Sequence, residues 1–142
     1  MLININNEQS LKKIDEEKIK KICEHVIINE YKDDDFELNL LITDNERISY
    51  FNENYRQKSE PTDVLSFEYG LEEPVIGDIV ISVETIETQA PLFNNSFEQE
   101  FYYILIHGLL HILGYDHIDD EENKKIMFNK QDEYFKTLIE EG

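Results

Sequence analysis

The chain has 142 residues, of which 40% are hydrophobic and 32% charged, and its formal net charge is −19. The size and composition are those of one folded domain, whereas this charge excludes the general basic surface that attracts phosphates in most nucleic-acid-binding proteins. No apolar run reaches the roughly eighteen residues of a membrane span, and the opening residues do not form a secretory signal. One cysteine, Cys23, excludes an internal disulfide and fits a reducing compartment, so we expect a cytoplasmic protein.

The first part of the chain predicts strands and helices in alternation, from apolar periodicity and from residues that cap helices. We expect, in order, an edge strand at residues 2–5, a helix from an Asp15 cap to about Tyr31, a strand at 36–42, and a helix opened by a capping box of Thr43 and Glu46 that ends near Arg56.

The second part predicts strands at residues 64–67 and 77–82, one or two helical turns at 83–88, a helix capped by Ser96 and Gln99, and a last amphipathic helix capped by Asp119. The apolar side of that last helix is expected to carry Ile126, Met127, Tyr134, Phe135, Leu138 and Ile139. These elements predict a single α+β domain over residues 1–142, with about four strands in one mixed sheet and about five helices packed on it.

Three histidines, His107, His111 and His117, lie in the stretch H-G-L-L-H-I-L-G-Y-D-H. Two histidines four residues apart share one face of a helix, and Gly114 can end the helix and turn the chain so that His117 returns to that face. Three neutral imidazoles with an open fourth position are typical of catalytic zinc, so we expect one bound zinc ion, or another divalent transition metal, at the end of a buried helix. His25 has no second ligand near it and is expected to pack in the core.

The same offsets occur in metzincin peptidases, whose pattern H-E-x-x-H-x-x-G-x-x-H has a glutamate as general base after the first histidine. Gly108 stands at that position here. A metal-dependent hydrolase of peptides or amides is therefore an alternative function. The glutamate that would act as its general base is missing.

Two further segments accompany the histidine motif, namely Y-R-Q-K-S-E-P-T-D-V-L-S-F at residues 55–67 and G-D-I-V-I-S at residues 77–82. Together the three segments closely resemble the YbeY family of bacterial endoribonucleases, over nearly the whole chain. The resemblance implies a zinc-dependent endoribonuclease that cuts single-stranded RNA, matures the 3′ end of small-subunit ribosomal RNA and acts in ribosome quality control. It also implies the ribosome or its proteins as partners, with no DNA and no membrane. By position, the three histidines resemble the metal ligands and Arg56 the functional arginine.

A divalent metal on three imidazoles lowers the pKa of its bound water towards about 7. We expect this water or hydroxide to attack the phosphodiester while the guanidinium of Arg56 clamps two phosphate oxygens. Attack by the 2′-hydroxyl of the RNA is the alternative, and it would leave a cyclic phosphate. Asp63 and Asp116 could accept hydrogen bonds from the ligand histidines and orient them.

Residues 59–123, which include the histidine motif, contain no lysine or arginine. An acidic surface often meets a basic protein, so a third hypothesis is a non-catalytic, ribosome-associated module that binds a structural metal. In that case Arg56 would be a helix-end residue that pairs with the helix dipole or with a carboxylate.

Overall fold

The computed structural model describes residues 1–33, 35–56, 62–115 and 121–140. In chain order the elements are β1 (Leu2–Asn7), α1 (Glu16–Tyr31), β2 (Glu37–Thr43), α2 (Asn45–Arg56), β3 (Val64–Glu68), β4 (Gly77–Ser82), α3 (Val83–Gln89), the 3-10 turn η1 (Ala90–Phe93), α4 (Phe97–Ile112), α5 (Glu121–Phe135) and the π turn η2 (Lys136–Glu140). Within the described ranges, no helix is both long enough and apolar enough to span a bilayer.

The four strands form one mixed sheet in the order β1-β2-β4-β3. β1 and β4 both run parallel to β2, and β3 is antiparallel to β4. In β2 the side chains of Leu38, Leu40 and Ile42 are buried while Glu37, Asn39 and Leu41 are half-buried, because successive residues of a strand face opposite sides. The predicted α+β class, with four strands in a mixed sheet and five α-helices, is confirmed for the part of the chain described.

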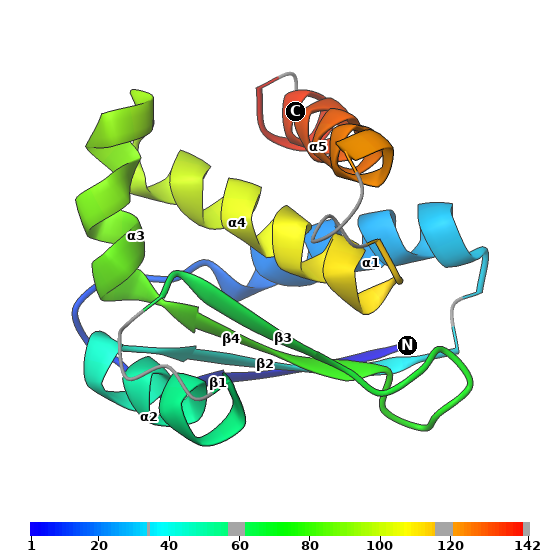
Figure 1. Cartoon of the computed structure of the whole chain (residues 1–142), viewed down its shortest axis with the longest axis horizontal. Coiled ribbons are helices and arrows are strands. Elements are labelled where there is room, and N and C mark those ends of the chain that lie inside the picture. Colours follow the sequence, from blue (N-terminus) through cyan, green and yellow to red (C-terminus); the bar gives the residue numbers. More distant parts are fainter. Residues whose placement is uncertain (34, 57–61, 116–120, 141–142) are drawn as a thin grey trace.

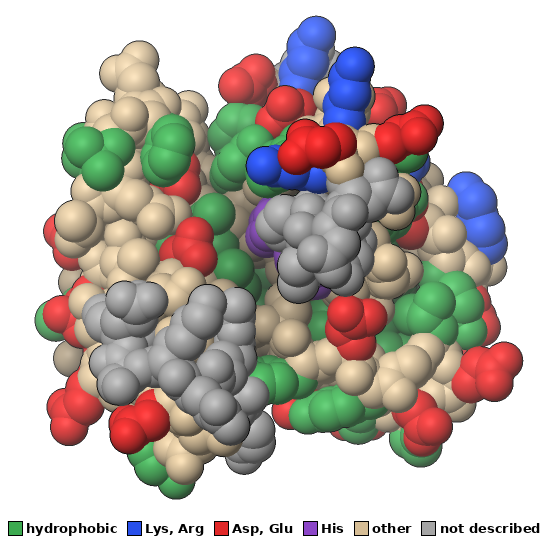
Figure 2. All heavy atoms as spheres, viewed as in Figure 1, with side chains coloured by type: hydrophobic (Ala, Val, Ile, Leu, Met, Phe, Trp, Pro, Cys, Tyr) green, Lys and Arg blue, Asp and Glu red, His purple; other side chains and the backbone are tan. Residues whose placement is uncertain are grey.

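The helices lie on both faces of the sheet (Figure 1). α1 and α4 cover one face, α5 packs on the outer side of α4, and α2 lies against the opposite face. α4 contacts β3, β4, α1, α3 and α5, which explains why its sequence is apolar around most of its circumference. In space-filling form, the same view shows a hollow beside the histidine side chains, on the face where α4 lies between α3 and α5 (Figure 2).

Two of the predicted helix caps are confirmed and one is wrong. Asp15 accepts a hydrogen bond from the backbone N–H of Lys18, and Ser96 forms the expected capping box. The cap of α2 is Asp44, whose carboxylate accepts from the N–H of Arg47 at 3.0 Å, and Thr43 is instead the last residue of β2. The hydroxyl of Thr43 donates to Glu8 at 2.7 Å, so a tertiary contact takes the group that was expected to cap the helix.

The last helix differs from its prediction on its inner side. Its buried residues are Met127, Gln131 and Phe135, at steps of four, whereas Ile126 is 42% exposed and was wrongly placed inside. The predicted cap, Asp119, lies outside the described residues. A glutamine in a buried stripe needs hydrogen-bond partners, and those partners prove to lie at the histidine pair.

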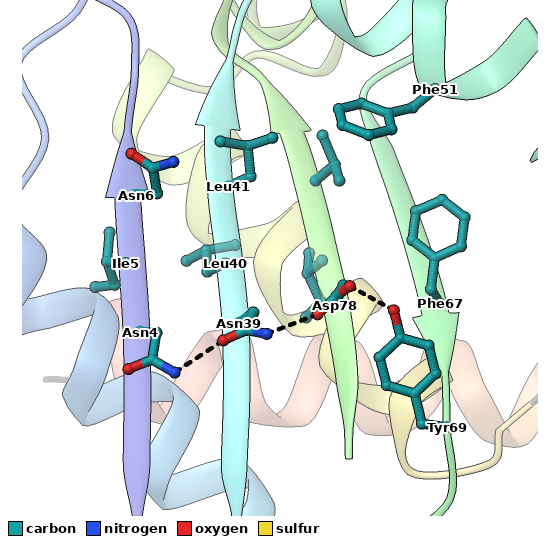
Figure 3. A pocket seen from close by; sticks show the side chains of 12 residues that line it. Asn4, Ile5, Asn6, Asn39, Leu40, Leu41, Phe51, Phe67, Tyr69 and Asp78 are labelled. Carbon is teal, nitrogen blue, oxygen red and sulfur yellow. Dashed lines mark hydrogen bonds between the residues drawn. The ribbon is translucent and has the colours of Figure 1, made fainter. Parts of the chain in front are cut away.

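The sheet face away from α4 is covered only in part by α2, and a shallow cavity of about 400 Å³ remains there. One polar side chain from each strand or its end crosses this face, and the four bond to one another (Figure 3). Asn4 donates to Asn39, and both Asn39 and Tyr69 donate to Asp78. This row of hydrogen bonds suits a face that is open to water on one side.

Candidate metal centre

α4 presents His107 and His111 from the same face, one turn apart. Its N-terminus is held by Ser96, whose hydroxyl accepts from the N–H of Gln99 at 3.1 Å while the side chain of Gln99 accepts from the N–H of Ser96 at 2.8 Å. The Nε2 atoms of the two histidines are 3.2 Å apart, and both rings line a cavity. The predicted third ligand, His117, lies outside the described residues.

The spacing of the two nitrogens fits a tetrahedral metal ion. Two ligands at the usual zinc–nitrogen distance and a tetrahedral angle are about 3.3 to 3.4 Å apart, because each bond is about 2.0 to 2.1 Å long. The observed 3.2 Å between the Nε2 atoms of His107 and His111 is close to this value. The distance between the pair is therefore compatible with two of the three predicted nitrogen ligands.

Gln131 of α5 determines which nitrogen of His107 can bind a metal. Its side-chain NH₂ donates to the carbonyl oxygen of Tyr103 at 3.0 Å, and a carbonyl can only accept, so the amide orientation follows. The Oε1 atom of Gln131 then faces Nδ1 of His107 at 3.0 Å, and this Nδ1 must carry the proton. The lone pair of His107 is consequently on Nε2, the atom that faces His111.

We expect Gln131→Leu to weaken zinc binding by about ten- to a hundredfold, because loss of a partner that orients a ligand histidine has an effect of that size. The affinity is measured by competition with a chromophoric chelator. Met127→Leu is the matched control, since Met127 is fully buried one turn earlier in the same stripe. An equal loss of affinity in both variants would mean that packing of α5, and not the hydrogen bond to His107, is responsible.

The chain leaves α4 through a left-handed turn, as the glycine predicted. Gly114 has a φ of 101°, and the N–H groups of Gly114 and Tyr115 bond back to the carbonyls of His111 and Leu110, both at 3.0 Å. This geometry ends the helix at the histidine pair and reverses the direction of the chain.

Glu30 of α1 anchors the segment that leaves this turn. Its carboxylate accepts from the hydroxyl of Tyr115 at 2.6 Å, from the hydroxyl of Tyr134, and from Lys130 at 3.3 Å. Burial raises the pKa of this carboxyl, but the two hydroxyls and the lysine charge outweigh burial and hold the pKa below its usual value. An ionised Glu30 therefore connects α1 with α5 and with the turn after α4, which precedes His117 in the sequence.

Gly108 lies where α4 comes closest to the sheet. A Cβ at this position would be 3.3 Å from side-chain atoms of Val64, Ser66 and Ile79, and the hydroxyl of Ser66 donates to the Gly108 carbonyl at 3.4 Å. Close packing thus explains the glycine, and a glutamate would not fit here without displacing these neighbours. The glutamate that acts as base in metzincin peptidases is therefore absent at a position where a larger side chain would crowd the sheet.

The histidine pair lines a cavity of about 970 Å³, bounded by β3, α3 with η1, α4 and α5. Three carboxylates line it, those of Asp63, Glu68 and Glu100, and its described lining residues include no lysine or arginine. Glu100 is only 2% exposed and accepts hydrogen bonds from Gln89 and Asn95, each at 2.9 Å. The described walls of the cavity are therefore acidic and hydrogen-bonded, with aromatic groups between.

The other predicted site residues fall in different places. Asp63 lines the same cavity, where its carboxylate accepts from Gln89 at 3.1 Å and from the N–H of Val64 at 2.8 Å, and its proposed effect on a ligand histidine remains a prediction. Arg56 is the last residue of α2, and its side chain is outside what the structure describes, as is all of Asp116. His25 of α1 is exposed, so the prediction that it packs in the core is wrong, and its ring contacts the ring of Tyr134 on α5.

Cys23 is fully buried, and burial raises the pKa of its thiol to about 12, which fits the predicted packing role. Sequence patterns did not single out Gln131 or Glu100. The only local signal for Gln131 is a polar residue at a buried position of an apolar stripe.

The chain is similar to known proteins over nearly its whole length. A protein of Petrotoga mobilis named endoribonuclease YbeY is 63% identical over 141 residues, which are 99% of this chain and 98% of that protein. A protein of the same name from Syntrophotalea carbinolica is 37% identical and aligns with 99% of this chain and 97% of its own length.

A solution structure of a Thermotoga maritima protein superposes with a TM-score of 0.71 at 34% identity, covering 98% of this chain and 90% of that one. The family model described as endoribonuclease YbeY matches residues 4–139, which include all of the sheet except the first two residues of β1, the histidine pair and the helix that carries Gln131. With relatives this similar over nearly its full length, the chain belongs to the endoribonuclease YbeY family.

Proposed function

We propose that this protein is a zinc-dependent endoribonuclease that cuts single-stranded RNA in the cytoplasm. Its proposed tasks are maturation of the 3′ end of small-subunit ribosomal RNA and ribosome quality control, with the ribosome or ribosomal proteins as partners. The observation that carries the proposal is the pair of Nε2 atoms, 3.2 Å apart, at the wall of a cavity of about 970 Å³ in a chain of this family.

A zinc ion held by His107, His111 and His117 would polarise a phosphoryl oxygen and make water more acidic. The chain's own residues have separate tasks in this proposal. Gln131 keeps the proton of His107 on Nδ1, so that Nε2 stays a ligand. Arg56 binds two phosphate oxygens through its forked guanidinium and stabilises the charge that grows during cleavage.

The hydrolase of peptides or amides is the weaker alternative. The glutamate that serves as base in metzincins is replaced by Gly108, where an added Cβ would lie 3.3 Å from three side-chain atoms of the sheet and would crowd them. The non-catalytic module is also weaker, because a structural zinc normally has four protein ligands, mostly Cys and His, and the histidine motif supplies three.

We expect the zinc-loaded protein to cut a labelled single-stranded RNA and to leave double-stranded RNA, single-stranded DNA and casein intact. Cleavage is followed on denaturing gels, and analysis of the new 3′ ends for cyclic phosphate separates water attack from attack by the 2′-hydroxyl. A His111→Ala sample purified in parallel controls for contaminating ribonuclease. Zinc-dependent cleavage of casein with RNA left intact would contradict the proposal in favour of a peptidase.

A further inference from the structure

Phe93 stands exposed at the rim of the histidine cavity on a short, rigid turn. η1 ends at Asn94, which has a left-handed φ of 59°, and the N–H of Asn95 bonds back to the carbonyl of Ala90 at 3.0 Å. The side chain of Asn95 also donates to the buried Glu100, which fixes the turn to α4. Phe93 is nevertheless 65% exposed and lines the cavity, so its ring is accessible to a group that enters there.

Phe128 of α5 is the second aromatic ring in the cavity wall. Its centroid is 5.8 Å from that of His107, and the two rings are tilted by 33°. Since α3 with η1 lies at one end of α4 and α5 lies over its other part, the two phenylalanines come from different walls of the cavity (Figure 1). A flat group on Phe128 would lie next to the histidine pair, and one on Phe93 would lie further away.

The charge of the described walls selects which part of an RNA strand can enter. Asp63, Glu68 and Glu100 line the cavity without a described cation among the lining residues, so phosphates are repelled from these walls. Bases are uncharged and flat, and their amino groups can donate to carboxylates. The exposed Lys124 and Lys125 in the first turns of α5 are not among the residues that line the cavity.

On the basis of the proposed endoribonuclease function, we propose that Phe93 and Phe128 are stacking surfaces for unpaired bases of the substrate RNA. Phe128 holds the base beside the phosphodiester that is cut, and Phe93 holds a base further along the strand. Stacking on an aromatic ring accepts every base, because each has a π-face. Stacking also requires unpaired bases. A cavity that binds RNA in this way therefore binds single strands better than duplexes.

The kinetic test compares Phe93→Ala with Phe93→Trp and with Leu92→Ala. Leu92 is the matched control, because it is the neighbouring residue, is 79% exposed and does not line the cavity. We expect Phe93→Ala to raise KM for a single-stranded RNA about tenfold with little change in kcat, the usual size for one lost stacked base. Phe93→Trp should retain the wild-type KM, and Leu92→Ala should not change it.

The binding test uses a single-stranded RNA that contains one 2-aminopurine, and its fluorescence is read by stopped flow in the time before the strand is cut. We expect its fluorescence to be quenched when the zinc-loaded wild type binds and to be quenched less with Phe93→Ala or Phe128→Ala. A strand with abasic positions has the same phosphates and is expected to bind at least tenfold more weakly, because its phosphates alone gain little from acidic walls.

Each outcome separates this inference from the proposed function. RNA cleavage by the wild type with an unchanged KM in Phe93→Ala would overturn base stacking at Phe93 and leave the endoribonuclease proposal standing. Equal losses in Leu92→Ala and Phe93→Ala would also overturn it, because Leu92 does not line the cavity. Quenching without cleavage would support the stacking site and contradict the activity, and a wild type that neither binds nor cuts RNA would contradict both.

Discussion

His111→Ala is expected to abolish stoichiometric zinc binding and, with it, cleavage of RNA. The substitution removes one of the two nitrogens that lie 3.2 Å apart and leaves His107 and His117, and two imidazoles hold a divalent ion far more weakly than three. The fold should persist, because the buried side chains of α4 near this position, Leu109 and Ile112, are unchanged. Zinc per chain is measured by mass spectrometry after dialysis against a weak chelator.

His25→Ala is the control for this experiment, since His25 lies on α1 against Tyr134 and is expected to have no part in binding metal. It should retain one zinc per chain. Cobalt substitution gives a second readout, because a tetrahedral site with nitrogen ligands has a visible spectrum that His111→Ala should lose. One tightly bound zinc per chain in His111→Ala would place the metal elsewhere.

The helix that carries the histidines could be predicted because its signals are local. Ser96 and Gln99 form the capping box within four residues, and Gly114 takes the left-handed turn that a residue with a Cβ adopts less easily. The offset of four between His107 and His111 then requires that they share a face. Each of these features depends on neighbours in sequence, so one sequence was sufficient to predict it.

The cap of α2 shows where local signals are ambiguous. Thr43 with Glu46 and Asp44 with Arg47 both have the spacing of a cap, and the choice between them depends on Glu8, which takes the Thr43 hydroxyl. Glu8 is 35 positions away, and no local pattern contains that contact.

The polar residues around the histidine pair could not be predicted for the same reason, because their contacts join residues that are far apart in the sequence. Gln131 reaches His107 across 24 positions and Tyr103 across 28, because α5 folds back over α4. A glutamate in the first turn of a helix is usually exposed, yet Glu100 is 2% exposed and accepts hydrogen bonds from Gln89 and Asn95. The acidic character of the cavity depends on this packing.

Arg56→Ala is expected to lower kcat for RNA cleavage about a hundredfold while zinc content and folding stay nearly unchanged, the usual loss when one donor to the charge of a transition state is removed. α2 ends at Arg56, and Thr62 and Asp63, six and seven positions later, line the cavity of the histidine pair. Arg56→Lys should recover only part of the loss, because an ammonium group cannot hold two phosphate oxygens in a forked geometry. Single-turnover rates and melting temperatures are measured on both variants.

Arg47→Ala is the matched control, because Arg47 lies in the same helix, bonds to Glu8 at 3.4 Å and stacks over the ring of Phe51 at 4.9 Å. Its loss should lower the melting temperature slightly and leave the cleavage rate unchanged. If Arg56 only stabilises the end of α2, Arg56→Ala should behave like Arg47→Ala, with a stability loss of about 0.3 to 1 kcal/mol and an unchanged rate per folded molecule. A large loss of rate at constant melting temperature and constant zinc content therefore separates a residue that contacts the substrate from one that supports the helix.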